Sequence, residues 1–258
     1  MGKDMTQGNL AKTLVLFTVP LVLSGLFQQM FNWVDAFIVG NVEGEISLAA
    51  IGATTAIYSL FITIIIGFTS GLSILAAQQY GMGEKQKLKA TMSSFVVLLG
   101  GIFILLAILG IIFTSPILVL LNTPENLFLI AGQYLRIMFI GIPFLAIYNT
   151  YAAILRGLGD SRAAFLSVIV SSVTNVVLDI IFVAVLRYGA AGAAVATVIS
   201  QGAMTIFIVI YTIKNYHHLR FRFDRHVIDK NVLKKGFEFG LPPSAQSGAS
   251  SVGNLILQ

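Results

Sequence analysis

Long stretches without a single charged residue constrain this sequence more than any other feature. Residues 48–80 and 90–115 contain no Asp, Glu, Lys or Arg. Each is longer than the roughly 20 mostly apolar residues that carry an α-helix across a lipid bilayer. In the whole chain, 57% of residues are hydrophobic and 10% are charged, against about 25% charged in a soluble domain. Because so few charges cannot cover a water-facing surface, we expect lipid to cover much of this one.

Six apolar stretches divide the sequence in the same way. They comprise residues 13–37, 48–80, 90–115, 126–155, 163–186 and 188–213. The links between them are short, and only the segment after residue 213 is both long and polar. The stretches also lack the period-2 alternation of a transmembrane β-barrel. The sequence therefore predicts an all-α, polytopic membrane protein with a bundle of six transmembrane helices.

The basic residues are distributed unevenly between the two ends of these predicted helices. Of the 16 Lys and Arg residues, 14 fall on one side if six helices are counted. Arg187 falls on the other side, and Arg136 lies within the fourth stretch. Cytoplasmic loops carry the excess of Lys and Arg, so we expect a plasma or inner membrane protein with a cytoplasmic N-terminus. This placement accounts for the net charge of +5, so we expect no nucleic-acid partner.

The end of the sequence echoes its beginning. Shifted by 222 positions, four identities pair the two segments: Lys12 with Lys234, Phe17 with Phe239, Pro20 with Pro242 and Asn32 with Asn254. Repeated helical halves are common in transporters. We therefore expect a six-helix lobe at 1–213, a basic cytoplasmic linker at 214–235, and the start of a second lobe's first helix at 236–258, with the rest of that lobe missing.

Charged residues inside the apolar stretches need a reason, because one at the bilayer centre costs about 2.5–3.5 kcal/mol. Asp35, Asp179 and Arg136 are the three of this kind. Arg136 lies near the outer end of its stretch, where a long side chain snorkels to lipid headgroups. The two acids have no basic partner on their own helix faces. Such carboxylates are typical of a site that takes up H⁺ or Na⁺.

Polar side chains accompany both acids at helical spacing. They form stripes on the first, fifth and sixth stretches: Gln28, Asn32 and Asp35; Ser171, Asn175 and Asp179; and Thr197 and Gln201. With the N-terminus inside, Asp35, Asp179 and Thr197 all fall in the outer half of the membrane and can meet. Asn149, late in the fourth stretch, fits this depth less well. The alternative is that these residues only hold helices together, at about 0.6 kcal/mol a contact.

Little else in the sequence indicates chemistry. There is no cysteine, and hence no disulfide or thiolate metal site. No nucleophile stands beside a base in a recognisable arrangement, so we expect neither an enzyme nor an organic cofactor. Pro20 lies within the first stretch, where a proline removes a backbone hydrogen bond and kinks the helix. We expect a kink there that is either static or a hinge.

Several segments, taken in order, resemble a known family. They are Pro20 with residues 28–35 (QQMFNWVD), residues 77–81 (AQQYG), 134–136 (YLR), 141–144 (GIPF) and 155–162 (LRGLGDSR), and Asn175 with Asp179. Over essentially its whole length, the chain resembles the N-terminal lobe of a multidrug and toxic compound extrusion (MATE) transporter. The resemblance implies two six-helix lobes around a central cavity, and export of cationic or amphiphilic drugs in exchange for H⁺ or Na⁺.

The resemblance also implies roles for particular residues. It places Asp35, Asp179 and Asn175 in the cation site, where they are also the residues suited to Na⁺, and it adds Asn149 and Thr197 as further polar positions. Gln28, Asn32 and Gln201 are candidates for the drug cavity. Ala152 and Phe31 stand where some relatives place Asn and Tyr, which leaves the choice between H⁺ and Na⁺ open.

Two other functions remain alternatives. A lipid-linked oligosaccharide flippase of the same superfamily would need a strongly basic cavity for pyrophosphate. The membrane stretches hold almost no Lys or Arg, which argues against it. A non-transporting membrane scaffold would tolerate replacement of both acids by Leu.

Overall fold

The computed structural model describes residues 10–219 and 229–257, and all the regular structure in these residues is helical. The elements are α1 (Leu10–Glu43), α2 (Glu45–Gly81), α3 (Lys85–Leu120), α4 (Glu125–Gly157), α5 (Arg162–Asp179), the π-helix η1 (Ile180–Val185), α6 (Gly189–Asn215), the 3₁₀ turn η2 (His217–Leu219) and α7 (Lys230–Leu257). Six helices are long and apolar enough to cross a membrane, with α5 and η1 forming one span. This confirms the predicted count of six and the all-α class, with a seventh helix after them.

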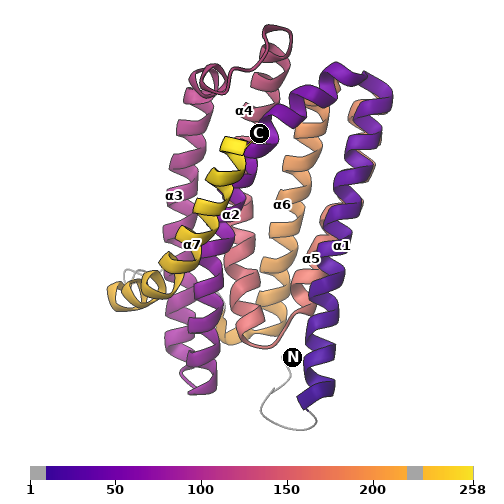
Figure 1. Ribbon diagram of the computed structural model, residues 1–258. Helices are drawn as coiled ribbons and strands as arrows, with labels where there is room; N and C mark the ends of the chain where they lie inside the picture. Colours follow the sequence, from indigo (N-terminus) through magenta and orange to yellow (C-terminus); the bar gives the residue numbers. More distant parts are fainter. Residues whose placement is uncertain (1–9, 220–228, 258) are drawn as a thin grey trace.

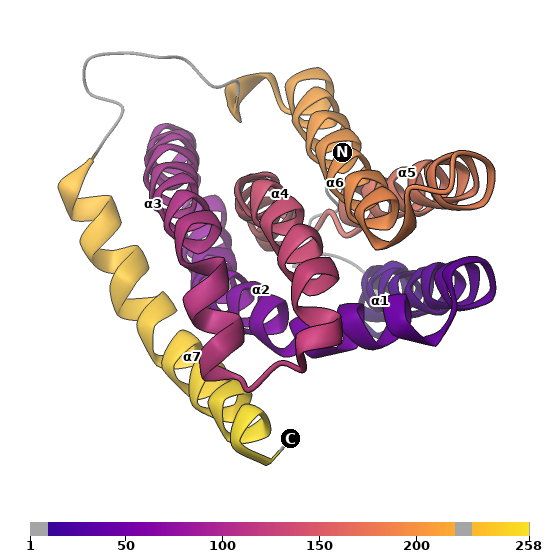
Figure 2. The ribbon, with the colours of Figure 1, turned by 90° about the horizontal axis from the view of Figure 1, so that it is seen from above.

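Helix α4 lies at the centre of the bundle (Figures 1 and 2). It packs against α2, α3 and α6, and 61% of its most apolar window is buried, the largest share of the six spans. Phe139 of α4 shows how close this packing is, because a Cβ added to Gly110 of α3 would lie 2.7 Å from its ring. The uncharged parts of α2 and α3 (residues 48–80 and 90–115) therefore have apolar surface on all sides, as expected of helices with α4 on one side and lipid on the other.

Helices α1 and α5 form one edge of the bundle, as Figure 2 shows from above. α1 packs mainly on α5, and only 6% of its most apolar window is buried. α5 in turn packs on α6. Of the six spans, α1 is therefore the one held by the fewest neighbouring side chains, although it carries one of the two membrane acids.

Short, specific connections explain why the helices follow one another so closely. Gly44 alone separates α1 from α2, and its φ of 82° is a conformation that residues with a Cβ rarely adopt. Asp160 precedes α5, and its Oδ1 accepts hydrogen bonds from the backbone N–H groups of Arg162 and Ala163. Its Oδ2 accepts a 2.7 Å hydrogen bond from the Tyr216 hydroxyl, which joins the start of α5 to the end of α6.

Glycine brings α7 into backbone contact with α2. A Cβ added to Gly67 would lie 2.5 Å from Ser244 Cα, and one added to Gly71 would collide with the backbone of Phe239 and Gly240. Gly67 and Gly71 are four residues apart, so they face α7 together. Small residues at this spacing are what allows membrane helices to pack at short range.

The observed helices run further than the apolar stretches that predicted them. The break between the predicted stretches 13–37 and 48–80 reduces to Gly44, and α3 continues through Pro116 to Leu120. Hydropathy marks only the lipid-buried part of a helix, whereas the backbone keeps pairing its N–H and C=O groups beyond it. A proline inside a membrane helix costs one such bond without ending the helix. The π-helical turns at Ile180–Val185 were not predicted, because their wider winding leaves no mark on hydropathy.

The division into a six-helix lobe, a linker and the start of a second lobe remains a prediction. The structure shows where the helices on either side of the expected linker end and begin. α6 ends at Asn215, and α7 begins at Lys230 because Asp229 Oδ1 accepts the backbone N–H groups of Asn231 and Val232. α7 thus starts before residue 236. Residues 220–228 of the expected linker, residues 1–9 of the expected cytoplasmic tail and residue 258 lie outside the described residues.

Candidate cation site

The two membrane acids meet between α1 and α5. The carboxyl groups of Asp35 on α1 and Asp179 at the end of α5 lie beside each other, close enough to interact electrostatically. Asp179 is completely buried, and Asp35 is partly buried with its Oδ1 atom fully enclosed. Two carboxylates cannot satisfy each other, because an ionised carboxylate accepts hydrogen bonds and donates none. The pair therefore needs a proton or another cation between its oxygen atoms.

Asn175 and Thr197 extend this pair toward α6. Asn175 is completely buried one turn before Asp179, and its Nδ2 donates a 3.3 Å hydrogen bond to Thr197 Oγ1. This bond directs the amide nitrogen toward α6 and leaves Asn175 Oδ1 without a donor. The spacing of four places that oxygen on the same face of α5 as the Asp179 carboxylate.

Unpartnered acceptor oxygens distinguish this region from the rest of the described chain. Five buried side-chain oxygens there find no hydrogen-bond partner: Asp35 Oδ1, Asn175 Oδ1, Asp179 Oδ1 and Oδ2, and Gln201 Oε1. All five belong to residues that the sequence singled out. Buried polar atoms are almost always hydrogen-bonded, and each exception calls for an explanation such as a bound ion. Oxygen ligands of this kind suit small hard cations.

Gln201 joins three helices beside the pair. Its Nε2 donates a 2.7 Å hydrogen bond to the Tyr58 hydroxyl of α2. Its Oε1 packs against Gly141 of α4, at the place where a Cβ would stand. Gln201 is only 6% exposed, so it lies in the packed interior rather than on an open cavity wall.

Two tyrosines belong to the site but were missed by the sequence analysis. Tyr134 of α4 is buried and lies near Asp35, Asp179 and Tyr58. Tyr58 holds Gln201 in place. Nothing in the sequence distinguishes these two tyrosines from the other six, because a tyrosine in a membrane helix carries no charge to stand out. The only signal was the position of Tyr134 in the YLR segment.

The structure does not bring Asn149 to the acids. Its Nδ2 donates to Leu145 O of its own helix at 2.9 Å. Tyr134, which lies beside the acid pair, is on the same helix and 15 residues earlier, which is ~22 Å along the axis at 1.5 Å per residue. Asn149 therefore lies at another depth of the membrane.

The remaining predicted residues lie on α1. Gln28 and Asn32 are exposed, so they form a polar edge on the open side of the bundle, on the same face of α1 as Asp35. α1 is continuous through Pro20, whose carbonyl accepts a 2.7 Å hydrogen bond from Ser24 Oγ. Arg136, the third charged residue within the predicted stretches, is exposed on α4. Its Nη2 donates a 3.1 Å hydrogen bond to Ser115 Oγ.

Comparisons with known proteins agree with this fold. The sequence pattern of the MatE family matches residues 20–181, which include both acids and Asn175. The chain belongs to the MatE family. It is therefore a multi-pass membrane protein of a transporter family and not an enzyme.

Two similar relatives come from Bacillus subtilis. The chain is 36% identical over 212 residues to the probable multidrug resistance protein YpnP of Bacillus subtilis (strain 168), covering 82% of this chain and 48% of the relative. It is 37% identical over 245 residues to the probable multidrug resistance protein YoeA of the same organism, covering 90% and 52%. The chain thus spans about half the length of the curated relatives it matches.

The fold is also that of solved MatE structures. An outward-facing structure of a multidrug resistance MATE family transporter superimposes with a TM-score of 0.89 at 24% identity, covering 98% of this chain and 56% of that one. The half-length match agrees with a chain that forms one lobe.

Proposed function

We propose that this chain is the N-terminal lobe of a secondary active antiporter that exports cationic or amphiphilic drugs in exchange for H⁺ or Na⁺. The lobe would lie in the cell membrane with its N-terminus in the cytoplasm, and the linker at 214–235 would lead to a second six-helix lobe. The coupling cation would be held by Asp35, Asp179 and Asn175, with Thr197 orienting the amide.

The proposal rests mainly on the set of buried oxygen atoms without hydrogen-bond donors. Asp35, Asp179 and Asn175 supply four buried acceptor atoms that lack donors within the described residues. A proton would let one carboxyl donate to the other, and Na⁺ would take oxygen atoms from both acids and the amide. The residues present therefore fit either cation. H⁺ needs the smaller rearrangement of the site, because the two carboxyl groups lie beside each other.

The position of the pair supports coupling to movement. With no cation, two adjacent negative charges in a low-dielectric region repel each other. α1 is the span that yields most readily, because few side chains bury it and Pro20 interrupts its backbone hydrogen bonding. Cation binding would therefore draw α1 toward α5, and cation release would loosen it. The exposed edge of Gln28 and Asn32 would move with α1 and change the wall of the drug cavity.

The composition of the site favours an antiporter over a flippase. The described side chains around the pair are acids, amides, hydroxyls and phenols, with no Lys or Arg among them. A pyrophosphate-bearing lipid would find no cation there. Mutation distinguishes a non-transporting scaffold from an antiporter, because a scaffold would keep its activity with both acids changed to Leu.

Transport in vesicles tests the proposal. Vesicles would carry the complete two-lobe protein, since a single lobe is not expected to transport, and dye efflux would be driven by a Na⁺ gradient and by a pH gradient in separate runs. Asp179→Asn should abolish efflux driven by either gradient, while Glu125→Gln, at an exposed acid outside the site, should leave efflux unchanged. Undiminished efflux by a well-expressed Asp179→Asn protein would refute the role.

A further inference from the structure

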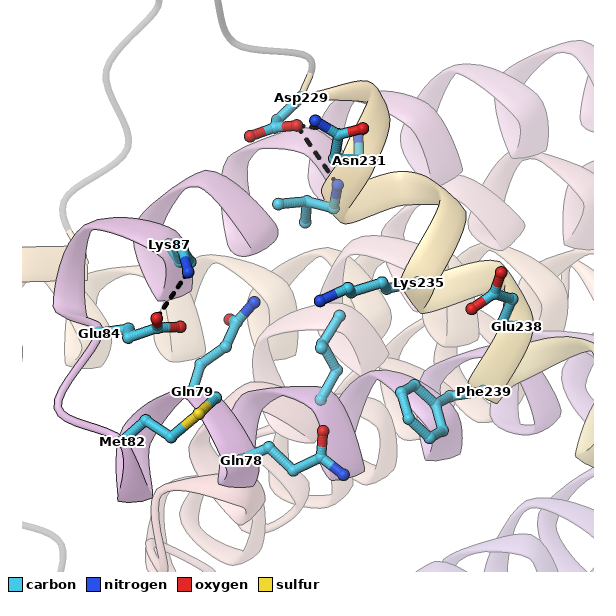
Figure 3. Close-up of a pocket in the computed structure, with 12 residues that line it drawn as sticks. Gln78, Gln79, Met82, Glu84, Lys87, Asp229, Asn231, Lys235, Glu238 and Phe239 are labelled. Atoms are coloured by element: carbon cyan, nitrogen blue, oxygen red, sulfur yellow. Dashed lines mark hydrogen bonds and ion pairs between the residues drawn. The ribbon is translucent and has the colours of Figure 1, made fainter.

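A hollow lies far from the acid pair, where α2, α3 and α7 come together (Figure 3). This is the end of the bundle that we propose to be cytoplasmic. Its volume is about 480 Å³, within the range of small-molecule sites. The end of α2 and the start of α3 form one wall, and the first turns of α7 form the other. The cation site and the drug cavity use none of these residues.

The lining changes from charged to apolar with depth. On α2, Leu75 lies six residues before Gly81, where the span ends, and so ~9 Å deeper in the membrane. On α7, the sequence runs from Asp229 at the helix start, through Lys235, to Phe239 further along. The α2 wall thus carries polar groups near its end and an apolar group deeper in the membrane, and Phe239 adds an apolar side chain from α7. That gradient matches an amphiphile better than a water-soluble metabolite.

Charges of both signs face the hollow. Glu84, Asp229 and Glu238 are opposed by Lys87 and Lys235, so acids are in excess. Lys87 Nζ contacts Glu84 Oε1 at 2.6 Å. Figure 3 shows Lys235 extending from α7 toward the side that Glu84 and Gln79 form. Within the described residues, Lys235 makes no ion pair, so its ammonium group remains available for an anion.

The shape of the hollow is fixed by close packing on either side of Lys235. A Cβ on Gly236 would collide with the Phe95 ring of α3, and Gly240 lies against Phe68 of α2. Ser94 Oγ of α3 accepts a 3.0 Å hydrogen bond from Asp229 N at the start of α7. These contacts hold the α7 wall at a set distance from α2 and α3.

We propose that this hollow binds the headgroup of a zwitterionic phospholipid that carries a phosphate and a primary ammonium group. Lys235 and Lys87 bind the phosphate, and the acids at the rim accept hydrogen bonds from the ammonium group. A purely anionic headgroup would meet the excess of carboxylates, and a quaternary ammonium group has no N–H to donate. The glycerol and first methylenes lie against Leu75 and Phe239.

Lipid-dependent thermal stability of the complete two-lobe protein, purified in detergent, tests the proposal. Phosphatidylethanolamine should raise the unfolding midpoint by ~2 °C or more, because a ligand that binds only the folded chain stabilises it. Phosphatidylcholine and phosphatidylglycerol should raise it by less than half as much. Lys235→Gln and Lys87→Gln should each remove most of the phosphatidylethanolamine shift, because both lysines bind the phosphate. Lys214→Gln, at an exposed lysine at the end of α6, is the matched control and should keep it.

Two results would overturn the assignment. The first is an equal shift with all three lipids, or a phosphatidylethanolamine shift that survives both lysine substitutions in variants whose lipid-free midpoints are unchanged. The second is an equal shift with soluble glycerophosphoethanolamine at the same concentration, because it would assign the site to a water-soluble phosphate ester instead of a membrane lipid. None of these thermal-stability measurements depends on transport activity.

Discussion

Asn175 Nδ2 of α5 and Thr197 Oγ1 of α6 are joined by a 3.3 Å hydrogen bond inside the bundle. This contact orients the polar face of α5 one turn before Asp179, and it leaves Asn175 Oδ1 free of donors beside the acid pair. α6 therefore positions the site without contributing a charge. α1 contributes Asp35 from the other side, and α4 closes the site with Tyr134.

Removing this hydroxyl should weaken cation binding more than it weakens the fold. Thr197→Val leaves Asn175 Nδ2 without its acceptor, at a cost of about 0.6–1.7 kcal/mol for a polar contact between membrane helices. The released amide can then rotate, which weakens its oxygen as a ligand. We expect lower affinity for the coupling cation, measured by equilibrium binding of labelled Na⁺ or by pH-dependent thermal unfolding.

A matched variant on the same helix separates this effect from general damage. Thr212 of α6 is also buried, but its hydroxyl donates to Ile208 O of its own helix, at 2.7 Å. Thr212→Val should therefore leave cation affinity unchanged. Equal losses in the two variants would remove the assigned role of Thr197.

The glycine contact between α2 and α7 should not accept a methyl group. A Cβ at Gly71 would collide with the backbone of Phe239 and Gly240, and overpacking of this kind costs about 1–3 kcal/mol. Because the chain has no native cysteine, Phe68→Cys with Phe237→Cys, whose rings now lie 5.6 Å apart, reports the contact through a short thiol cross-linker. Gly71→Ala should reduce cross-linking several-fold.

The control for that experiment is a helical glycine with open space around it. Gly101 of α3 has no atom within 4 Å of an added Cβ. Gly101→Ala should leave the cross-linking yield unchanged. Unchanged yield in Gly71→Ala as well would show that α7 does not rest on α2 as described.

His218, next to α6 on the connecting segment, should make stability depend on pH. Burial, and to a smaller degree the charge of Lys85, lower the pKa of this imidazole below its ordinary 6.5. The unfolded chain then binds a proton more readily than the folded chain, so the free energy of unfolding decreases as the pH falls below about 6.5. His218→Gln should reduce the fall in thermal midpoint between about pH 8 and about pH 5.5. The exposed neighbour variant His217→Gln should not, and an undiminished fall in His218→Gln would contradict the assignment.

The sequence predicted those residues of the candidate site that can be recognised from their position in the sequence alone. Asp35 and Asp179 are visible because a charge inside an apolar run is costly, and Asn175 and Thr197 follow from helical spacing and depth. Tyr134 and Tyr58 were missed because their role depends on which helices become neighbours. The resemblance placed Asn149 with the site, whereas Asn149 lies ~22 Å along α4 from Tyr134, which is near the acid pair.

The fold was predictable to the same extent. Six apolar stretches of sufficient length predicted six spans, because an unpaired backbone cannot cross lipid in another form. Gly67 and Gly71 carry the spacing of a helix-packing motif, but spacing does not name the partner, so their contact with α7 needed the structure. The π-helix after Asp179 likewise arises from packing and has no signature in composition.

Infrared difference spectroscopy of the carboxyl C=O band tests the central claim most directly. In the chain reconstituted in lipid, raising the pH or adding Na⁺ should remove a protonated-carboxyl band. That band should be absent from Asp35→Asn/Asp179→Asn and retained in Glu125→Gln. A band that ignores both pH and Na⁺, or one that persists unchanged in the double variant, would contradict a cation held between these two acids.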